Sequence, residues 1–384
     1  MMSSSPSLDR LVSQYYQQVE LPSLSLPAED ATLLHPITQH ALYNRMFNDS
    51  DPALWPLPPA HYRMRVLKLI IARLEQALTN PEEDEINDEL LETWGTLLTQ
   101  PKLPAIEQAQ QLTYIKYTAP HSSSSSTLEP TPQVQQPQDS PRTTITSESR
   151  GLILSSGTTG FRTWEAALHL GTYLATDSTA ARSLIQGKRV IELGAGTGFL
   201  AMFCAQHLRP KFVVTTDREL ALIEQIQDCA GRNGLYDTPG KFTAGIWEWG
   251  TRLDLPGFND ATAGGCSSDR EEEGDPPAGD AKDEATGLNF DVALGADLIY
   301  DVDLIPLLVA TIGDLFTNYG LQQFVISATL RNENTFRTFL TACEAQGFTV
   351  EQIPFTSRPE AEQTGFYHST AIPIHIYRIT RSTV

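Results

Sequence analysis

The sequence predicts an α/β fold with a mostly parallel sheet, preceded by a helical N-terminal extension. Residues 189–207 read as a short buried strand, a turn of alternating glycines and a helix. From there to residue 379, apolar strand patterns alternate with helical patterns, which implies crossover connections and helices on both faces of a sheet. Residues 1–117 instead carry apolar side chains at helical spacing.

The extension contains three predicted helices, at 7–20, 61–78 and 83–99. The middle one is the strongest prediction, because its apolar residues recur every three to four positions. We interpret residues 1–117 as a helical N-terminal domain.

A change of composition separates this domain from the rest. Residues 118–147 are dominated by Ser, Thr, Pro and Gln, with five consecutive serines at 122–126. Such a stretch buries too little apolar surface to offset the entropy lost on ordering. We therefore predict a disordered linker at 118–147 and a second domain at 148–384.

The second domain contains seven predicted strands with helices between most of them. The predicted strands are 189–193, 212–216, 241–246, 290–295, 324–328, 348–353 and 372–379, and the predicted helices are 163–174, 199–207, 219–231, 303–318 and 334–345. Thr163 is expected to cap the first of these helices. The last two strands have no helical pattern between them, which indicates an antiparallel hairpin at one edge. Residues 256–289 are rich in Gly, Asp and Glu and are predicted to be a disordered acidic insertion.

Composition narrows the possible partners. The net charge of −20 argues against nucleic acid, whose phosphates require clustered Lys and Arg, and it suits a partner that presents lysine. The four cysteines are scattered without a Cys-x-x-Cys pair, so we expect neither a metal site nor a disulfide framework. No charged start with an apolar run and no membrane-spanning stretch is apparent, so we expect an intracellular protein without a membrane partner.

The glycine turn is the predicted cofactor site. Gly194, Ala195, Gly196 and Gly198 connect a strand to a helix N-terminus, where backbone N–H groups and the helix dipole meet a ligand. A dinucleotide fingerprint has its third glycine where this chain has Phe199, so the spacing differs from that motif. Glu192, two positions before the first glycine, is placed to meet a cationic part of the ligand. A structural turn without a ligand is the alternative.

Two further residues follow neighbouring strands. Asp217 ends the second strand, where an acid can accept both hydroxyls of a ribose; capping of the next helix is the alternative. Trp249 follows the third strand and is expected to stack on adenine, with Trp247 as its rival because strand alternation directs only one of the two toward the ligand. Trp164 lies at the start of the predicted helix 163–174, and its ring either closes over the ligand or packs against the protein core.

The fourth strand leads into Ala296, Asp297 and, three positions on, Tyr300. We expect Ala296 to contribute to the cofactor site, and Asp297 and Tyr300 to orient a nucleophilic amine. A reaction at such an amine depends mainly on positioning and desolvation. The alternative for Asp297 is a cap of the following turn.

Taken together, Trp164, the segment 192–198, Asp217, Trp249 and the Asp-x-x-Tyr at 297–300 resemble methyltransferase family 16, the seven-strand protein-lysine methyltransferases. The resemblance covers residues 150–380. It implies a seven-strand Rossmann-like sheet, S-adenosyl-L-methionine as cofactor, and catalytic roles for the last two residues. The acidic insertion departs from the family, whose members generally have a shorter connection there.

Within the family, residues 155–167 and the helical extension are similar to the subgroup that methylates eukaryotic elongation factor 2. This similarity implies a cytoplasmic enzyme whose partner is that factor. Three alternatives remain: methylation of another protein, such as another elongation factor or a chaperone; a catalytically silent binding module; and a nicotinamide-dependent oxidoreductase, which the glycine spacing disfavours.

Overall fold

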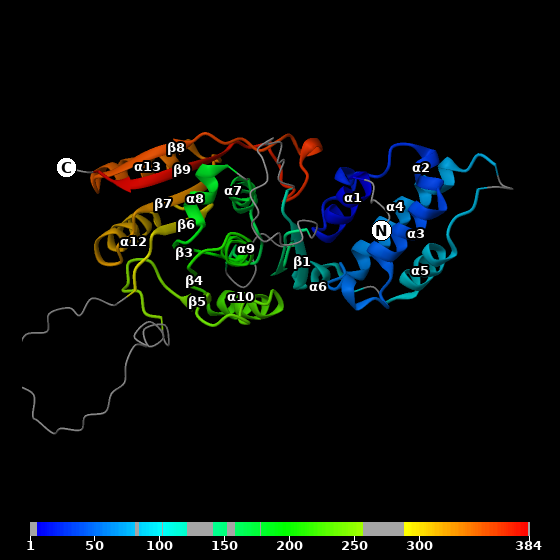
Figure 1. Ribbon diagram of the computed structural model, residues 1–384, viewed down its shortest axis with the longest axis horizontal. Coiled ribbons are helices and arrows are strands. Elements are labelled where there is room, and N and C mark those ends of the chain that lie inside the picture. Colours follow the sequence, from blue (N-terminus) through cyan, green and yellow to red (C-terminus); the bar gives the residue numbers. More distant parts are fainter. Residues whose placement is uncertain are drawn as a thin grey trace, which may run out of the picture. The chain divides into compact units, whose positions relative to one another are not determined.

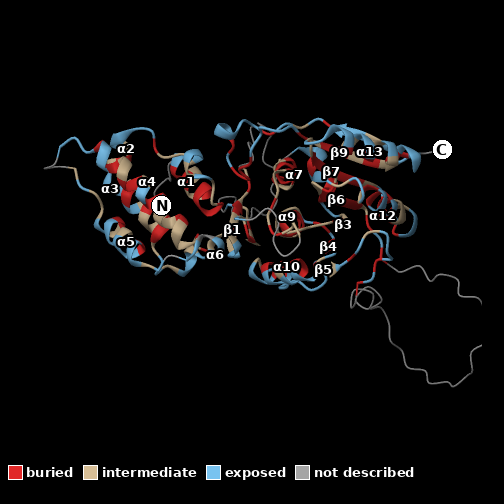
Figure 2. Cartoon of the chain, turned by 180° about the vertical axis from the view of Figure 1, so that it is seen from behind, coloured by how far each residue is buried: buried red, intermediate tan, exposed pale blue. Residues whose placement is uncertain are grey.

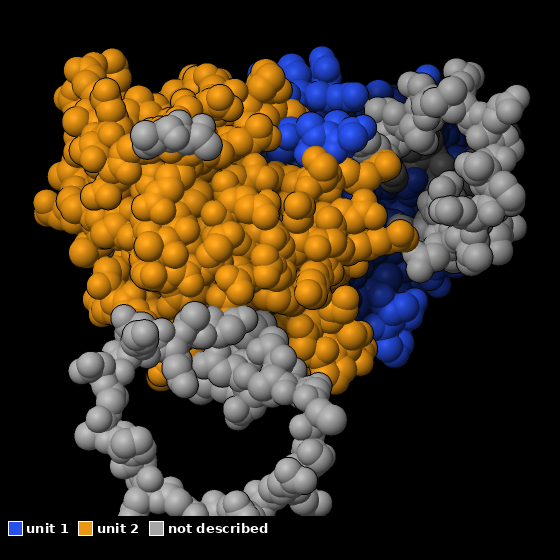
Figure 3. All heavy atoms as spheres, turned by 60° about the vertical axis from the view of Figure 1, so that its left-hand side comes forward, with its two compact units in different colours: residues 1–181, 196–199, 356–372 blue, residues 182–195, 200–355, 373–384 orange. Residues whose placement is uncertain are grey.

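The computed structural model describes residues 6–80, 84–101, 103–120, 141–151, 158–176, 178–255 and 288–382. The chain divides into two compact units, coloured separately in Figure 3. Unit 1 comprises residues 1–181, 196–199 and 356–372, and unit 2 comprises residues 182–195, 200–355 and 373–384. The acidic insertion predicted at 256–289 falls almost entirely outside the described residues.

Unit 1 begins with a helical region built around α4 (Figure 1). Its helices are α1 (Pro6–Tyr16), α2 (Asp30–Leu34), α3 (Pro36–Leu42), α4 (Ala60–Ala77), α5 (Asp88–Thr99) and α6 (Ala105–Gln110). The apolar stripe of α4 lies in a core that includes Tyr15, Phe47 and Leu74, all fully buried. Figure 2 colours the chain by burial, with buried residues in red. The predicted helix at 61–78 is therefore confirmed, and its periodic residues form the core of this region.

Two helix boundaries of the extension were predicted wrongly. The helix expected at 83–99 begins at Asp88, because the side chain of Asn87 accepts a hydrogen bond from the Leu90 amide and caps it. The helix expected at 7–20 ends at Tyr16, and Gln18 then adopts a left-handed backbone conformation with φ of 54°.

A two-stranded hairpin follows the helices, and the sequence did not predict it. β1 (Thr113–Thr118) pairs antiparallel with β2 (Thr143–Glu148), from Thr113 opposite Glu148 to Thr118 opposite Thr143. β2 lies where the end of a linker was expected. Its buried positions alternate along the strand, as expected for a strand with one face against a core.

The remaining sheet has seven strands in the order β5-β4-β3-β6-β7-β9-β8. The strands are β3 (Arg189–Glu192), β4 (Phe212–Asp217), β5 (Phe242–Ile246), β6 (Val292–Ala296), β7 (Gln323–Thr329), β8 (Phe348–Ile353) and β9 (Ile374–Arg381). The first five in this order are parallel, whereas β9 runs antiparallel to both β7 and β8. This confirms the parallel sheet, its seven strands and the antiparallel edge.

The connecting helices of unit 2 cover both faces of the sheet. α9 (Phe199–His207) and α10 (Leu220–Arg232) lie on one side, and α12 (Ile305–Asn318) and α13 (Glu333–Ala345) on the other (Figure 1). Right-handed crossovers require this arrangement, because the strand order runs outward from β3 to β5 and then restarts on the other side at β6. Phe290, Phe324 and Phe339 are fully buried in the core beneath α12 and α13.

Two helices lie between the hairpin and the sheet along the chain. α7 (Glu165–Ala175) begins later than predicted, and α8 (Thr179–Ile185) was not predicted. Thr163 does not cap α7, since Trp164 occupies the N-cap position and makes no side-chain capping bond. Within the described residues, no helix is long and apolar enough to cross a membrane.

Candidate active site

The glycine turn connects β3 to α9 through three residues with left-handed backbones. Gly194, Gly196 and Gly198 have φ values of 56°, 56° and 73°, a region that strongly favours glycine. A Cβ atom on Gly194 would lie 2.8 Å from the Leu298 side chain and 3.2 Å from the Trp249 ring. The turn is tied to the neighbouring strand by a hydrogen bond of 3.0 Å from the Ala195 amide to the Thr216 carbonyl. A side chain at the first glycine is therefore excluded both by conformation and by space.

Parallel pairing brings the predicted residues of unit 2 to one edge of the sheet. Glu192 ends β3, Asp217 ends β4 and Ala296 ends β6, and these strands are neighbours. Trp249 follows β5, which pairs with β4. The carboxyl ends of parallel strands are where open α/β sheets bind ligands. The structure therefore gathers these positions as the sequence predicted.

The side chain of Glu192 is directed at the protein itself. It is 3 % exposed, and its Oε2 accepts hydrogen bonds from the Ala201 amide at 3.0 Å and the Thr215 hydroxyl at 3.3 Å. Burial raises the pKa of Glu192 to about 8. Because the Ala201 amide belongs to the first turn of α9, the carboxyl group fixes that helix start. A contact with a cationic part of the ligand stays a prediction.

The two tryptophans after β5 differ in environment. Trp247 is 3 % exposed, belongs to the hydrophobic core of unit 2, and donates from Nε1 to the Thr251 carbonyl at 3.0 Å. Trp249 is only partly buried, and its ring lies beside Gly194. This difference supports Trp249 as the residue that faces an adenine, which remains our prediction.

Asp217 lies at the end of β4 and is 9 % exposed. Its Oδ1 accepts from the Glu219 amide at 3.2 Å, which closes a small turn before α10. The N-cap of α10 is Glu219 and not Asp217. The alternative interpretation of Asp217 as a helix cap is therefore wrong.

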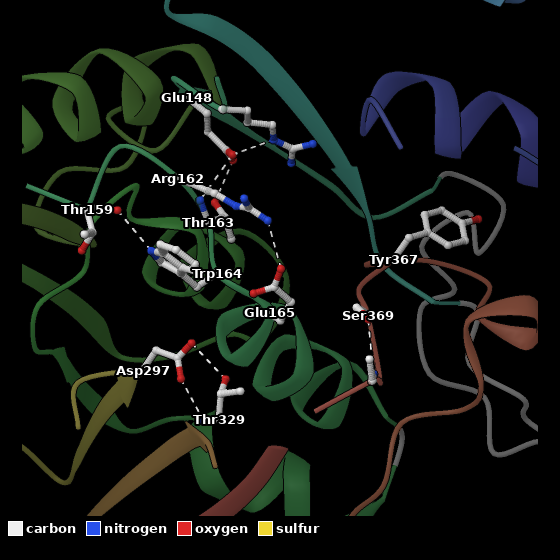
Figure 4. Close-up of polar contacts among 12 residues, drawn as sticks. Glu148, Thr159, Arg162, Thr163, Trp164, Glu165, Asp297, Thr329, Tyr367 and Ser369 are labelled. Carbon is white, nitrogen blue, oxygen red and sulfur yellow. Dashed lines mark hydrogen bonds and ion pairs between the residues drawn. The ribbon is translucent and has the colours of Figure 1, made fainter. Parts of the chain in front are cut away.

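Asp297 has an unusual backbone and several side-chain partners. Its φ of 53° is left-handed, an uncommon conformation outside glycine. Its Oδ1 accepts from the Thr329 amide at 2.8 Å and its Oδ2 from the Thr329 hydroxyl at 3.0 Å (Figure 4). Arg331 forms an ion pair with Oδ2 at 3.4 Å. The carboxylate is therefore fixed by the end of the neighbouring strand β7.

Tyr300, in contrast, is open to solvent. The residue is 59 % exposed, and partial burial raises the pKa of its phenol. The phenol is consequently neutral at ordinary pH and is able both to donate and to accept a hydrogen bond. Thr329 and Arg331, two partners of Asp297, were not predicted from the sequence. The one available signal was their position directly at the end of the next predicted strand.

Trp164 belongs to unit 1, where it occupies the N-cap position of α7. Its Nε1 donates to the Thr159 carbonyl at 3.1 Å (Figure 4), and the Arg162 guanidinium lies 5.0 Å from the ring centroid. The ring is partly buried. These contacts fix the orientation of the indole, and a contact with the ligand stays a prediction.

The donor set suits S-adenosylmethionine. A turn with three glycines, an acid at the end of the next strand and a partly exposed tryptophan match a backbone-bound group, a ribose and a purine. Phe199 is 1 % exposed, and its ring packs against those of Tyr117 and Phe366 with centroids 4.9 Å apart. The position where a dinucleotide fold needs glycine is thus filled by a core aromatic. Within the described residues, no cluster of metal-binding side chains occurs.

Comparison with known proteins agrees with this geometry. Residues 153–260 match the family model described as lysine methyltransferase. The chain is 37 % identical over 380 residues to protein-lysine N-methyltransferase EFM3 of Chaetomium thermophilum, covering 99 % of both chains. It is 30 % identical over 191 residues to EEF1A lysine methyltransferase 3 of Mus musculus, covering 50 % of this chain and 64 % of the relative.

A third relative is protein-lysine N-methyltransferase EEF2KMT of Bos taurus, with 27 % identity over 217 residues, covering 53 % of this chain and 56 % of the relative. The fungal relative is aligned along the helical extension as well as the sheet, so the likeness is not confined to the glycine turn. The chain therefore belongs to the lysine methyltransferase family, whose members transfer a methyl group from S-adenosylmethionine to a lysine of a protein.

Proposed function

We propose that this methyltransferase modifies a lysine of translation elongation factor 2 in the cytoplasm. The support is the likeness of residues 155–167, and of the helical extension before them, to the subgroup that acts on that factor. The bovine relative carries the name EEF2KMT. The mouse relative is named for EEF1A instead, so EEF1A is the second candidate substrate.

We propose the following division of labour at the site. Gly194, Ala195, Gly196 and Gly198 hold the cofactor by their backbones, Asp217 accepts from the ribose and Trp249 stacks on the adenine. Glu192, Trp164 and Ala296 complete this cofactor site. When bound, the cofactor supplies an electrophilic methyl group.

Asp297 and Tyr300 act on the lysine. The Asp297 carboxylate, fixed by Thr329, attracts the lysine ammonium and orients its nitrogen, competing with Arg331 for the same oxygen. The neutral Tyr300 phenol holds the amine by a hydrogen bond after a proton has left for solvent, which the exposure of this side chain permits. Positioning of a neutral amine supplies most of the rate gain.

The substrate proposal is tested by direct competition. Full-length protein is incubated with radiolabelled S-adenosylmethionine and equal amounts of purified elongation factor 2, EEF1A and a chaperone. Label on elongation factor 2 alone, located to one lysine by mass spectrometry, is the expected result. Label on EEF1A alone would replace the proposed substrate by the second candidate. Absence of label on all three, together with normal cofactor binding, would favour a silent binding module.

We further propose that residues 1–117 recognise the substrate. Leu91 and Leu98, one face of α5 seven residues apart, are 41 % and 48 % exposed, and Asp88, Glu89 and Glu92 lie on the same helix. An acidic, partly apolar surface suits a lysine-bearing partner. The double variant Leu91→Ala/Leu98→Ala should raise KM for elongation factor 2 about tenfold at unchanged cofactor Kd. Thr96→Ala on the same helix is the control, and equal KM values would refute the assignment.

A further inference from the structure

Glu148, the last residue of β2, has a carboxylate with no solvent exposure and an unusually complete set of donors. Its Oε1 accepts from the hydroxyls of Tyr117, Thr146 and Thr163, each at 2.7 Å. Its Oε2 accepts from Arg150 Nε at 3.0 Å and from the Thr163 amide at 3.3 Å. All of these residues belong to unit 1, and Figure 4 shows the contacts to Thr163.

The group is ionised. Burial raises the pKa of Glu148, but the Arg150 guanidinium and the hydrogen bonds from Tyr117, Thr146 and Thr163 outweigh burial and hold the pKa below its usual value. An ionised carboxylate has no proton to give, so every neighbouring hydroxyl must donate to it.

This condition determines the direction of the next hydrogen bond. The Thr163 hydroxyl has a single proton, which it gives to Glu148, so its oxygen accepts from its other partner. That partner is the Thr197 hydroxyl, 2.7 Å away. Thr197 lies between Gly196 and Gly198 in the glycine turn and is 6 % exposed. The charge of Glu148 therefore dictates the hydroxyl orientation of a residue in the cofactor turn.

The same hairpin contacts the other end of the turn. Tyr117, which donates to Glu148, packs its ring on Phe199, the first residue of α9. Arg150 in turn donates from Nη1 to the Gln17 carbonyl just after α1, at 2.7 Å. Residues 196–199 are thus held by a hydrogen bond from Thr197 to Thr163, which itself donates to Glu148 of the hairpin, and by packing of Phe199 on Tyr117 of the hairpin.

We propose that Glu148 is a positioning residue for S-adenosylmethionine binding, acting through Thr163 on Thr197. Glycines lose more conformational entropy on ordering than any other residue, so a three-glycine turn is costly to fix. A turn that is already fixed before the ligand arrives binds more tightly, because that cost has been met during folding. The proposal rests on the assignment of the glycine turn to the cofactor.

The competing possibility is that the network only stabilises the hairpin. The two differ in what each threonine should do. Thr163 links Glu148 to Thr197 in the turn, whereas Thr146 donates to the same Glu148 oxygen from within β2 and does not bond to the turn. Valine replaces threonine with the same shape and without the hydroxyl, so three matched variants separate the two roles.

The experiment uses the full chain and S-adenosylhomocysteine, titrated by calorimetry, with the melting temperature of the ligand-free protein measured in parallel. Thr163→Val and Thr197→Val should each weaken Kd about tenfold, the equivalent of about 1.4 kcal/mol. Thr146→Val should lower the melting temperature while its Kd stays within twofold of wild type. Thr197→Ser, which keeps the hydroxyl, should bind nearly as wild type.

The double variant Thr163→Val/Thr197→Val should bind no more than about twofold more weakly than either single variant, because both substitutions break one hydrogen bond. Wild-type affinity in Thr163→Val and Thr197→Val would overturn the proposal, as would an equal loss of affinity in Thr146→Val. Gly196→Val separates this result from the site assignment. If Gly196→Val abolishes binding while the threonine variants bind normally, only the positioning role fails; if Gly196→Val also binds normally, the cofactor site itself is misplaced.

Discussion

At the carboxyl edge of the seven-stranded sheet, the acidic side chains of Glu192 and Asp297 are held in different ways. At the β3–β4 end, Glu192 is buried and receives only neutral donors, the Ala201 amide and the Thr215 hydroxyl, and its pKa rises to about 8. At the β6–β7 end, Asp297 receives two bonds from Thr329 and the cation of Arg331. A buried carboxyl group without a cationic partner, such as Glu192, suits a structural role. A carboxylate that is already paired with a cation, as Asp297 is with Arg331, suits the binding of a lysine ammonium.

The difference is consistent with the two tasks that we propose for this edge. In that proposal, the β3–β4 end, with the glycine turn and Asp217, binds the cofactor. The β6–β7 end, with Asp297 and the exposed Tyr300, binds the lysine. The following variants test whether changes at the β3–β4 end affect cofactor affinity and changes at the β6–β7 end affect turnover.

The largest effect is expected at Asp297. Asp297→Asn removes the charge and keeps the shape, and turnover should fall about a hundredfold or more, in the range of lost orienting or proton-handling groups. Cofactor Kd should stay within about twofold, because the residue lies at the lysine end. Steady-state kinetics on elongation factor 2 and calorimetry measure the two. Asp301→Asn, on the same loop, is the control, and a matching loss of affinity in Asp297→Asn would show that the two tasks are not separate.

Asp217 should give the converse result. Asp217→Ala should weaken S-adenosylmethionine binding by about 2–3 kcal/mol through the lost charge-assisted hydrogen bonds to the ribose. Turnover at saturating cofactor should change only a few-fold. The same titration on Asp228→Ala, an exposed acid of α10, provides the comparison. Unchanged affinity in Asp217→Ala would remove the ribose assignment.

A smaller effect is expected at Tyr300. Tyr300→Phe keeps the ring and loses only the hydroxyl, so turnover should fall about tenfold, less than at Asp297. KM for the cofactor should not change. Turnover equal to wild type would leave Asp297 as the sole lysine-orienting group, and a rise in cofactor KM would place the phenol at the other end of the site.

The smallest effect is a pH dependence at Glu192. With a pKa near 8 folded and an ordinary value near 4.5 unfolded, the folded state holds one more proton between these values, so stability falls as pH rises through that window. Glu192→Gln cannot titrate. The difference in melting temperature, Glu192→Gln minus wild type, should therefore increase from pH 5 to pH 8 and stay constant above pH 8. Parallel curves throughout would mean that the buried group is ionised.

The sequence predicted the sheet well because each strand–helix unit there has a local pattern. The helix at 199–207 was placed correctly from the glycines before it and the buried strand before them. The positions of Asp217 and Trp249 at one edge of the sheet could be predicted because parallel strands bring their carboxyl ends together whatever the side-chain details.

What the sequence could not provide were contacts between distant segments. β2 resembles a linker, since its buried face is threonine and glutamate rather than apolar residues. Burial of Glu148 is possible because Tyr117, thirty-one residues earlier in the chain, and the nearby Arg150 donate to its carboxylate. Thr163 was expected to cap a helix for the same reason: its bond to Glu148 spans fifteen residues and leaves no local trace.

The left-handed backbone at Asp297 has a consequence for how this position tolerates change. Glycine adopts φ of 53° without strain and asparagine does so readily, whereas most other side chains resist it. Fold stability should therefore be highest with glycine, asparagine or aspartate at this position, while methylation requires aspartate. A saturation library at position 297, sorted once for protein abundance and once for methylation activity, would rank the twenty residues in two different orders. Under selection for folding alone, this position would therefore accumulate glycine or asparagine, and the resulting proteins would fold without being active.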